Sequence, residues 1–216
     1  MRNQYQHQLD RVLSELVEMT GDVRAALATA TQALLEADVS AAEAVISGDL
    51  AIDEARERIE EDSFDILARQ APVAGDLRML VASLRMVADL ERMGDLSVHV
   101  AKVARLRFPT KAVPTALVPT IQQMAKTADE MIAAAAEIVA THDVDAAREL
   151  ESADDDMDRL RRSMFRTLLA DDWDSGVEPA VDLALLGRYY ERIGDHAVSM
   201  ARRIVFLVTG QHPVAG

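Results

Sequence analysis

The sequence predicts an all-α protein made of two tandem three-helix bundles, with six long helices related by an internal duplication. Half of the 216 residues are hydrophobic but only 4% are aromatic, and the chain has just 9 glycines and 6 prolines. This mixture of strong helix formers with few helix breakers is typical of all-α proteins. The duplication is visible in a short segment, LERMGD at residues 90–95, which returns as YERIGD at residues 190–195.

Three helices are predicted in the first half. Hydrophobic residues recur at three- and four-residue steps from the N-terminal segment to about residue 34, which indicates an amphipathic helix. Ser40 and Glu43 have the spacing of a capping box, so we expect the second helix to begin there and to end before Pro72. A third helix should run from residue 73 or 75 to about residue 106.

The second half repeats this order after a clear break. Residues 107–119, RFPTKAVPTALVP, hold three of the six prolines. Helices are predicted over about 115–141, 142–169 and 177–209. Lengths of about 25–35 residues per helix are expected in antiparallel bundles with short connections. We therefore divide the chain into bundles at residues 1–110 and 111–216.

Pairs of acidic residues four positions apart recur in both halves. The third-helix pairs repeat at an offset of 100 residues and the second-helix pairs at an offset of 105, a difference that the interhelical turns can absorb. The pairs are Asp49/Asp53 and Glu91/Asp95 in the first half, and Asp154/Asp158 and Glu191/Asp195 in the second. In the second half, Glu151/Asp155 is a rival register.

Acids at i and i+4 share one helix face, where they repel each other. Two such pairs on adjacent helices would bring four carboxylates together, and a cation would relieve the repulsion. The sequence therefore predicts metal sites, with Gly94 and Gly194 marking close approach or room for the cation. The alternative is a solvated acidic face neutralised by arginines such as Arg92 and Arg192.

The histidines add little to these sites. His99 continues the line of Glu91 and Asp95, but its counterpart in the second half is Ser199, so we expect a surface histidine. We expect the same of His196, which follows Asp195. Methionines 79, 86, 93, 124 and 131 follow helical spacing and are expected to fill the core.

Several function classes are disfavoured. The net charge of −14 repels nucleic-acid backbones, and the absence of cysteine excludes disulfides and thiolate sites. No long uncharged apolar run and no signal-peptide core are present, so we expect a cytoplasmic protein. No P-loop, nucleophile elbow or HExxH motif occurs, and Glu91 and Glu191 lack the following histidine of a ferritin-like di-iron site. We do not expect an enzyme.

With these motifs, the sequence resembles the PhoU family of phosphate-signalling regulators. The likeness covers nearly the whole chain and centres on residues 49–103, together with DLERMGD and YERIGDHAVSMARRI. The resemblance implies two three-helix bundles with metal clusters on the four acidic pairs. The metal would be a divalent or trivalent ion, with iron, zinc, magnesium and manganese all left open.

The resemblance also implies a role in signalling. Family members are thought to restrain phosphate uptake and phosphate-starvation signalling, as negative regulators of the Pho regulon in bacteria. The expected partners are a sensor histidine kinase and the ATPase subunit of the Pst phosphate transporter, so the protein would be peripheral to the membrane through partners only. The oligomeric state stays open, with a homodimer as one outcome. The alternatives are a metal-free helical scaffold and a metal-storage protein unrelated to phosphate signalling.

Overall fold

The protein is described by a computed structural model that covers residues 2–211, with the side chains of residues 5–151 and 154–211. In these residues the secondary structure consists of six long α-helices and one short 3-10 turn. The elements are α1 (Arg2–Glu36), α2 (Val39–Gln70), α3 (Gly75–Arg107), η1 (Thr115–Leu117), α4 (Val118–Thr141), α5 (Val144–Leu168) and α6 (Val177–Thr209).

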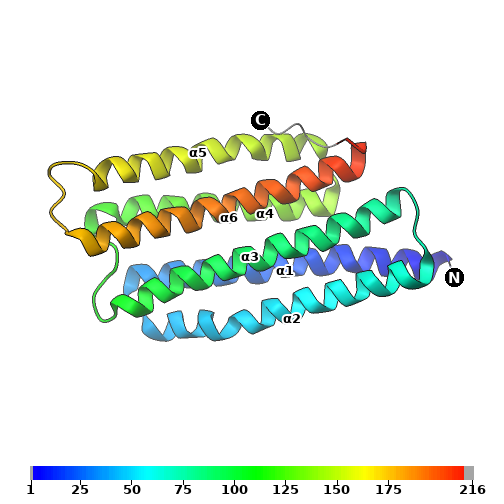
Figure 1. Cartoon of the computed structure of the whole chain (residues 1–216), viewed down its shortest axis with the longest axis horizontal. Helices are drawn as coiled ribbons and strands as arrows, with labels where there is room; N and C mark the ends of the chain where they lie inside the picture. Colours follow the sequence, from blue (N-terminus) through cyan, green and yellow to red (C-terminus); the bar gives the residue numbers. More distant parts are fainter. Residues whose placement is uncertain (1, 212–216) are drawn as a thin grey trace.

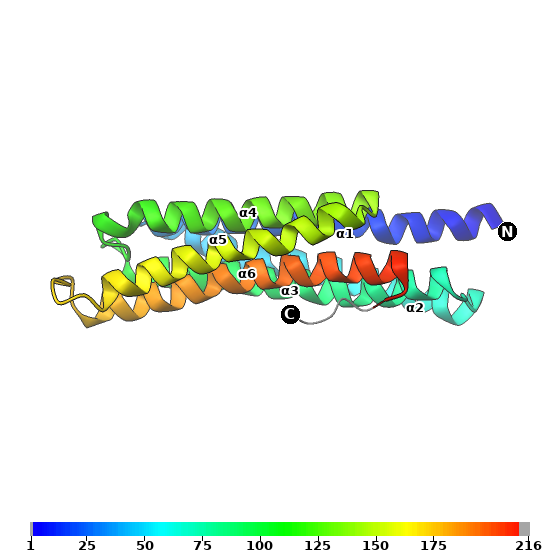
Figure 2. The same ribbon diagram turned by 90° about the horizontal axis from the view of Figure 1, so that it is seen from above.

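The helices form two three-helix bundles that lie side by side along one long axis (Figure 1). Helices α1, α2 and α3 pack on one another, as do α4, α5 and α6, and the bundles meet where α3 packs on α6 and α1 on α4. The N-terminal turns of α1 extend beyond the end of the second bundle (Figure 2). The predicted class, two tandem bundles of long helices, is confirmed. The predicted boundary at residues 110 and 111 lies between α3 and η1 and stays a prediction.

The helix ends agree with the predicted spans, but the predicted capping box at Ser40 and Glu43 is wrong. Helix α2 is capped two residues earlier by Asp38, which accepts hydrogen bonds from the Ser40 and Ala41 amides at 2.9 and 3.0 Å. An aspartate at this position satisfies amides that have no partner inside the helix. Glu43 instead pairs with Arg105 of α3 at 3.2 Å.

The duplication extends to the conformation of the connection between the first and second helix of each bundle. Asp143 caps α5 as Asp38 caps α2, with accepted bonds of 2.9 and 3.0 Å. The residues before these caps, Ala37 and His142, both adopt the left-handed conformation, with φ of 56° and 57°. The two turns are 105 residues apart, the same offset as the acidic pairs of α2 and α5.

The core of each bundle is aliphatic and rich in methionine. The five methionines expected in the core are all buried, with exposures of 7% or less. Burial follows the duplication, because buried positions of α1 recur 105 residues later in α4. Trp173 packs against the core at the α5–α6 turn, and its Nε1 donates to the Gly176 carbonyl at 2.8 Å.

The bundles are joined by contacts between residues that the duplication relates. On the α1–α4 side, Arg24 forms a two-bond ion pair with Asp129 at 2.7 and 2.9 Å, and these residues are 105 positions apart. Equivalent positions therefore face each other here, as residues do on the axis of a symmetric dimer. If the two halves had identical sequences, residues 24 and 129 would carry the same charge and would repel each other. This ion pair is therefore possible only because the two halves differ in sequence at this position.

Helices α3 and α6 pack in antiparallel directions. The duplication relates residues 89 and 189 in this interface, and the contacts are polar around the first and aromatic around the second. Asp89 of α3 is 7% exposed and accepts bonds from three side chains of α6: His196 Nδ1 at 3.0 Å, Ser199 Oγ at 3.2 Å and Arg203 Nε at 3.0 Å. At the position of Asp89 plus 100, Tyr189 stacks on His99 with ring centroids 5.3 Å apart.

The histidine predictions are thus half right. His99 is exposed, as expected, although it also packs on Tyr189. His196 is not a surface histidine, because it lies in the interface between bundles and contacts Asp89. None of the helices in the described part of the chain is both long and apolar enough to cross a membrane.

We expect Asp89→Ala to lower the free energy of unfolding by about 2–3 kcal/mol in urea denaturation. Removing one partner of a fully buried ion pair costs about 3–5 kcal/mol, and the partial exposure of Arg203 reduces that cost. The control is Asp10→Ala, which removes an exposed carboxylate and should change stability by less than about 0.5 kcal/mol. Equal effects from the two variants would contradict the role assigned to Asp89.

Candidate metal centres

The first candidate site lies between α2 and α3, where the two predicted acidic pairs stand on neighbouring helices. Burial raises the pKa of Asp49, and the charges of Asp95 and Asp53 raise it further. The pKa of Glu91 is raised by burial and then by Asp95, with a smaller contribution from Asp53. Each pair therefore lies within the electrostatic influence of the pair on the neighbouring helix.

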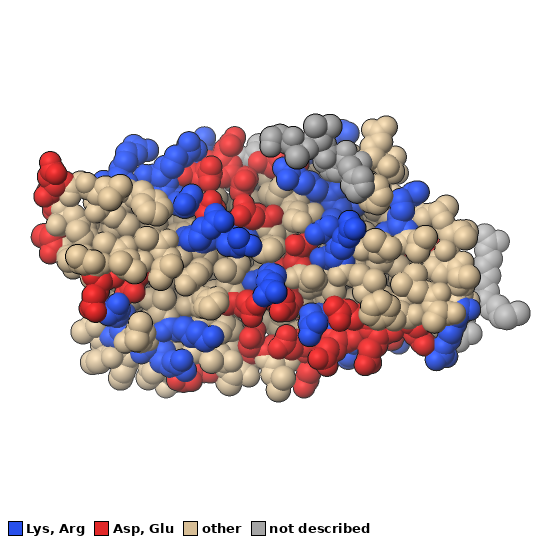
Figure 3. Space-filling view, in the orientation of Figure 1, with Lys and Arg blue, Asp and Glu red and all other residues tan. Residues whose placement is uncertain are grey.

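The second candidate site repeats this arrangement between α5 and α6. Burial raises the pKa of Asp154, followed by the charges of Asp195, Asp158 and Glu191. The pKa of Asp195 is raised by burial and by Glu191. Figure 3 shows acidic side chains gathered on both halves of this face of the molecule, with basic side chains between them.

The structure favours Asp154/Asp158 over the rival register in α5. Asp154 faces α6, where its Oδ1 lies 3.8 Å from the point that a Cβ on Gly194 would occupy. Asp155 is exposed, and Glu151 forms an ion pair with Arg202 at 2.7 Å. The rival pair therefore has one exposed member and one that is already neutralised.

Arginines neutralise part of each acidic cluster. In the first, Arg92 Nη1 donates to Asp95 at 3.0 Å, and Arg56 lies 4.0 Å from Asp53. In the second, Glu191 accepts from Arg188 at 2.5 Å and from Arg161 at 3.2 Å. The alternative of arginine-neutralised acids therefore describes several of the eight carboxylates.

Three of these arginines, Arg56, Arg161 and Arg188, were not among the neutralising residues predicted from the sequence. Arg56 and Arg188 sit three residues from Asp53 and Glu191 on the same helix, so helical spacing alone could have found them. Arg161 reaches Glu191 from a different helix, and only the packing of α5 on α6 brings it there. Arg192, which the alternative interpretation offers as a neutralising residue, is exposed and lowers the pKa of Asp195, but it forms no ion pair with a described residue.

The donor set fits a hard cation, although the carboxylates are not arranged as a finished site. Carboxylate oxygens suit magnesium, manganese and oxidised iron. Asp154 Oδ1 is buried and accepts no hydrogen bond, so one acceptor points into the second cluster without a partner. However, among the described residues no three acidic or histidine side chains converge closely enough to form a ready metal-binding group. Binding would require these side chains to rotate away from their arginines.

The glycines of the repeated segments mark close approaches between helices. A Cβ on Gly94 would lie 3.0 and 3.3 Å from Ile52 of α2 and 3.6 Å from Asp49 Oδ1. A Cβ on Gly194 would lie 3.1 and 3.2 Å from Met131 and 3.8 Å from Asp154 Oδ1. Each glycine therefore lets its helix approach the carboxylate that begins the acidic pair of the neighbouring helix.

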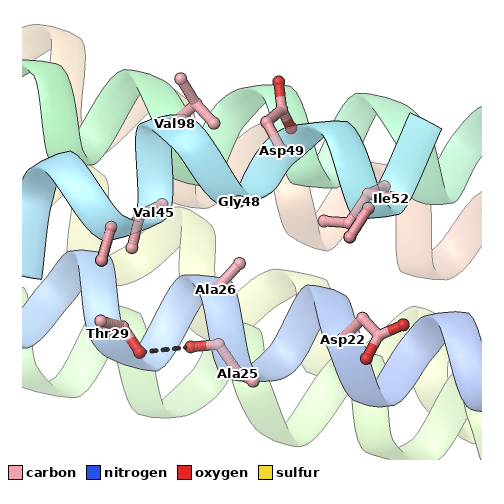
Figure 4. Close-up of a pocket in the computed structure, with 11 residues that line it drawn as sticks. Asp22, Ala25, Ala26, Thr29, Val45, Gly48, Asp49, Ile52 and Val98 are labelled. Carbon is pink, nitrogen blue, oxygen red and sulfur yellow. Dashed lines mark hydrogen bonds between the residues drawn. The ribbon is translucent and has the colours of Figure 1, made fainter. Parts of the chain in front are cut away.

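Asp49 also borders a pocket of about 290 Å³ between α1 and α2 (Figure 4). Small residues such as Ala26 and Gly48 leave this space open, and Asp22 of α1 lies across the pocket from Asp49. A pocket of about 440 Å³ occupies the equivalent place between α4 and α5, where Met131 stands in the position of Ala26. Both halves thus leave room beside the second helix that carries the acids.

We expect Gly94→Ala to be at least about 1 kcal/mol less favourable than Gly21→Ala in denaturant unfolding. Both replacements improve helix propensity, by about 1 kcal/mol. At Gly21 no atom lies within 4 Å of the new Cβ, whereas at Gly94 the buried Ile52 must move. An equal gain at both positions would show that the approach of α3 to α2 is not tight.

We expect Asp154→Asn to raise the free energy of unfolding of the metal-free protein by about 0.5 kcal/mol at pH 7. The pKa of Asp154 is raised in the folded state, so the carboxyl group of Asp154 binds a proton more tightly in the folded protein than in the unfolded chain. Stability is therefore lost as the pH rises from the ordinary pKa to the raised one, and the substitution removes that loss. Urea unfolding in the presence of a chelator measures the effect.

The matched control for this substitution is Asp155→Asn, which changes the same charge on the exposed side of α5. It should change stability less than Asp154→Asn. Below the ordinary carboxyl pKa range the difference between the variants should vanish, because both carboxyls are then protonated. Equal gains at pH 7 would mean that general charge, not the cluster, sets the effect.

Comparison with known proteins agrees with this architecture. The PhoU domain family matches residues 16–104 and 121–204, which cover most of both bundles. A Mycobacterium tuberculosis protein described as phosphate-specific transport system accessory protein PhoU homolog 2 is 46% identical over 213 residues, 99% of this chain and 100% of that protein.

Solved structures show the same fold. The crystal structure of PhoU from Pseudomonas aeruginosa has a TM-score of 0.89 at 29% identity and covers 96% of this chain and 100% of that one. The phosphate transport system regulatory protein PhoU from Streptococcus pneumoniae has a TM-score of 0.88 at 23% identity, covering 98% of this chain and 100% of that one. Because the family matches both bundles and a relative is similar over its full length, the chain belongs to the PhoU family.

Proposed function

We propose that the protein is a regulatory accessory of phosphate transport, which lowers phosphate uptake and phosphate-starvation signalling when phosphate is plentiful. The observation that carries this proposal is the full-length similarity to a protein named as an accessory of the phosphate-specific transport system. The name of that relative describes an accessory protein and states no reaction.

In this proposal the protein is an adaptor between the Pst transporter ATPase subunit and a sensor histidine kinase. Two long bundles fused side by side present extended helical surfaces, a shape suited to contacting two partners at once. The large acidic excess, with a net charge of −14, favours partners with basic contact surfaces. The proposal therefore assigns binding, and no chemical step, to this chain.

The adaptor proposal is tested by deleting the gene in its own host and measuring transcription of phosphate-uptake genes in phosphate-rich medium. We expect these genes to be derepressed, and restored repression on complementation. Copurification of the kinase and the transporter ATPase with the tagged protein tests the partners directly. Normal repression in a strain without any second copy of the gene would reject the regulatory role.

We further propose that the two acidic clusters bind metal ions. Asp49, Asp53, Glu91 and Asp95 would bind metal in the first bundle, and Asp154, Asp158, Glu191 and Asp195 in the second. A bound cation would supply positive charge between the second and third helix of each bundle. The support is the mutual repulsion of these carboxylates, the unpaired Oδ1 of Asp154 and the glycines that admit close approach.

A metal-loading experiment separates this proposal from a metal-free scaffold. Elemental analysis after loading with manganese or iron should show metal on the protein and less of it on Asp195→Ala. Metal that binds the folded state also raises its stability, and the increase should be smaller for Asp154→Asn than for Asp155→Asn. If loaded protein carries no metal and the variants respond alike, the acids serve only as a solvated surface.

A further inference from the structure

A pocket of about 220 Å³ lies on the interface between α3 and α6, apart from both acidic clusters. Its lining combines three arginines, one hydroxyl and an apolar side, with no carboxylate among the lining residues. These residues are Val81, Ala82, Arg85, Ser199, Arg202, Arg203 and Phe206. The protein has 37 acidic and 23 basic residues, so the positive charge of this pocket is opposite in sign to the net charge of the protein.

Figure 3 shows the charged side chains on the face where α3 and α6 run side by side. Basic side chains lie right of centre, over the line where α6 runs beside α3 in Figure 1. Arg85 and Arg203 also border a second pocket of about 420 Å³ along α3, which continues toward Arg56 and Arg92. This second pocket is mixed in charge, because Glu60, Asp89 and Glu91 also line it, so the arginine-lined pocket without carboxylates ends where it begins.

Two of the three guanidinium groups are held in place by acids outside the pocket. Arg203 donates through Nε to the buried Asp89 at 3.0 Å, and Arg202 donates through Nε to Glu151 at 2.7 Å. A guanidinium has five N–H donors, so bonds through Nε leave the terminal Nη groups available. Arg85 is exposed and forms no ion pair within the described part of the chain.

The duplication supplies an internal comparison. The residues 100 positions away from Arg85 and Arg203 are Leu185 and Val103, so the shared fold does not require arginine at either place. The residue equivalent to Asp89, which anchors Arg203, is Tyr189. The part of the α3–α6 interface that holds the pocket thus differs from the part related to it by the duplication at residues 85, 89 and 203. Two of these differences add positive charge to the pocket.

We propose that this pocket binds a phosphate group, either as inorganic phosphate or as part of a phosphate ester. Arginine guanidinium groups recognise phosphate oxygens through paired, charge-assisted hydrogen bonds. Three of them around one cavity match a tetrahedral dianion better than a carboxylate or a chloride ion. The apolar side formed by Val81, Ala82 and Phe206 gives room for the organic part of an ester.

Isothermal titration calorimetry on metal-free, chelator-treated protein tests the proposal. Inorganic phosphate and adenosine monophosphate are titrated separately, at an ionic strength held constant with chloride. Binding of inorganic phosphate would show that the free anion is sufficient, and binding of the nucleotide alone would identify an ester as the ligand. Either result supports the site, whereas binding of neither would overturn it.

The variant Arg85→Gln should weaken binding about tenfold, the typical effect of losing one charge-assisted hydrogen bond. It leaves the Arg203–Asp89 and Arg202–Glu151 pairs intact, and thermal unfolding checks that the variant folds. The matched control is Arg166→Gln on α5, which changes the same charge at an exposed position outside the pocket. An equal loss of phosphate affinity in both variants would mean that only the net charge of the protein matters, and it would reject the site.

This inference stands apart from the proposed function. The titration uses protein without metal and without partners, so a failure of the metal or adaptor proposals does not affect its outcome. Conversely, an absence of phosphate binding leaves the regulatory role to be judged by the gene deletion.

Discussion

The structure depends on the packing of its third helices. Helix α3 contacts both other helices of its bundle and also α6, and α6 has the same three kinds of neighbour in the second bundle. This crowding explains why their buried residues are nearly continuous from Met86 to Ala104 and from Tyr190 to Ala201. Of the acids in the repeated segments, Glu91 and Asp95 are half-buried and Asp195 is exposed, whereas Glu191 is buried beside α5.

The interface between the bundles shows how far a fused duplication can depart from symmetry. A dimer of identical bundles would bring equivalent residues together, and at residues 24 and 129 this would mean like charges. Fusion lets the halves differ, so Arg24 faces Asp129, and Asp89 is paired by α6 while Tyr189 stacks on His99. The two halves are therefore fixed to each other by pairs that neither half could form with a copy of itself.

Charge has opposite consequences in the two polar regions of this molecule. In the acidic clusters, burial and then like charges raise the pKa values of Asp49 and Asp154, and arginines relieve only part of the repulsion. In the α3–α6 interface, acids such as Asp89 position arginines around a pocket. The first region keeps an excess of negative charge and the second concentrates positive charge, so the two proposed ligand sites differ in the charge of the ligand that they would bind.

The sequence alone determined the six helices, the duplication and the four-residue spacing of the acidic residues. These depend on local periodicity and on spacing within one helix, which the chain order encodes directly. The tertiary structure decided which residues meet between helices, because the rotation of each helix about its axis is set by packing. It placed His196 on Asp89, 107 residues away, turned Asp154 rather than Asp155 toward α6, and brought Arg161 to Glu191. The arginine pocket likewise joins residues from two bundles, so no local pattern in the sequence could reveal it.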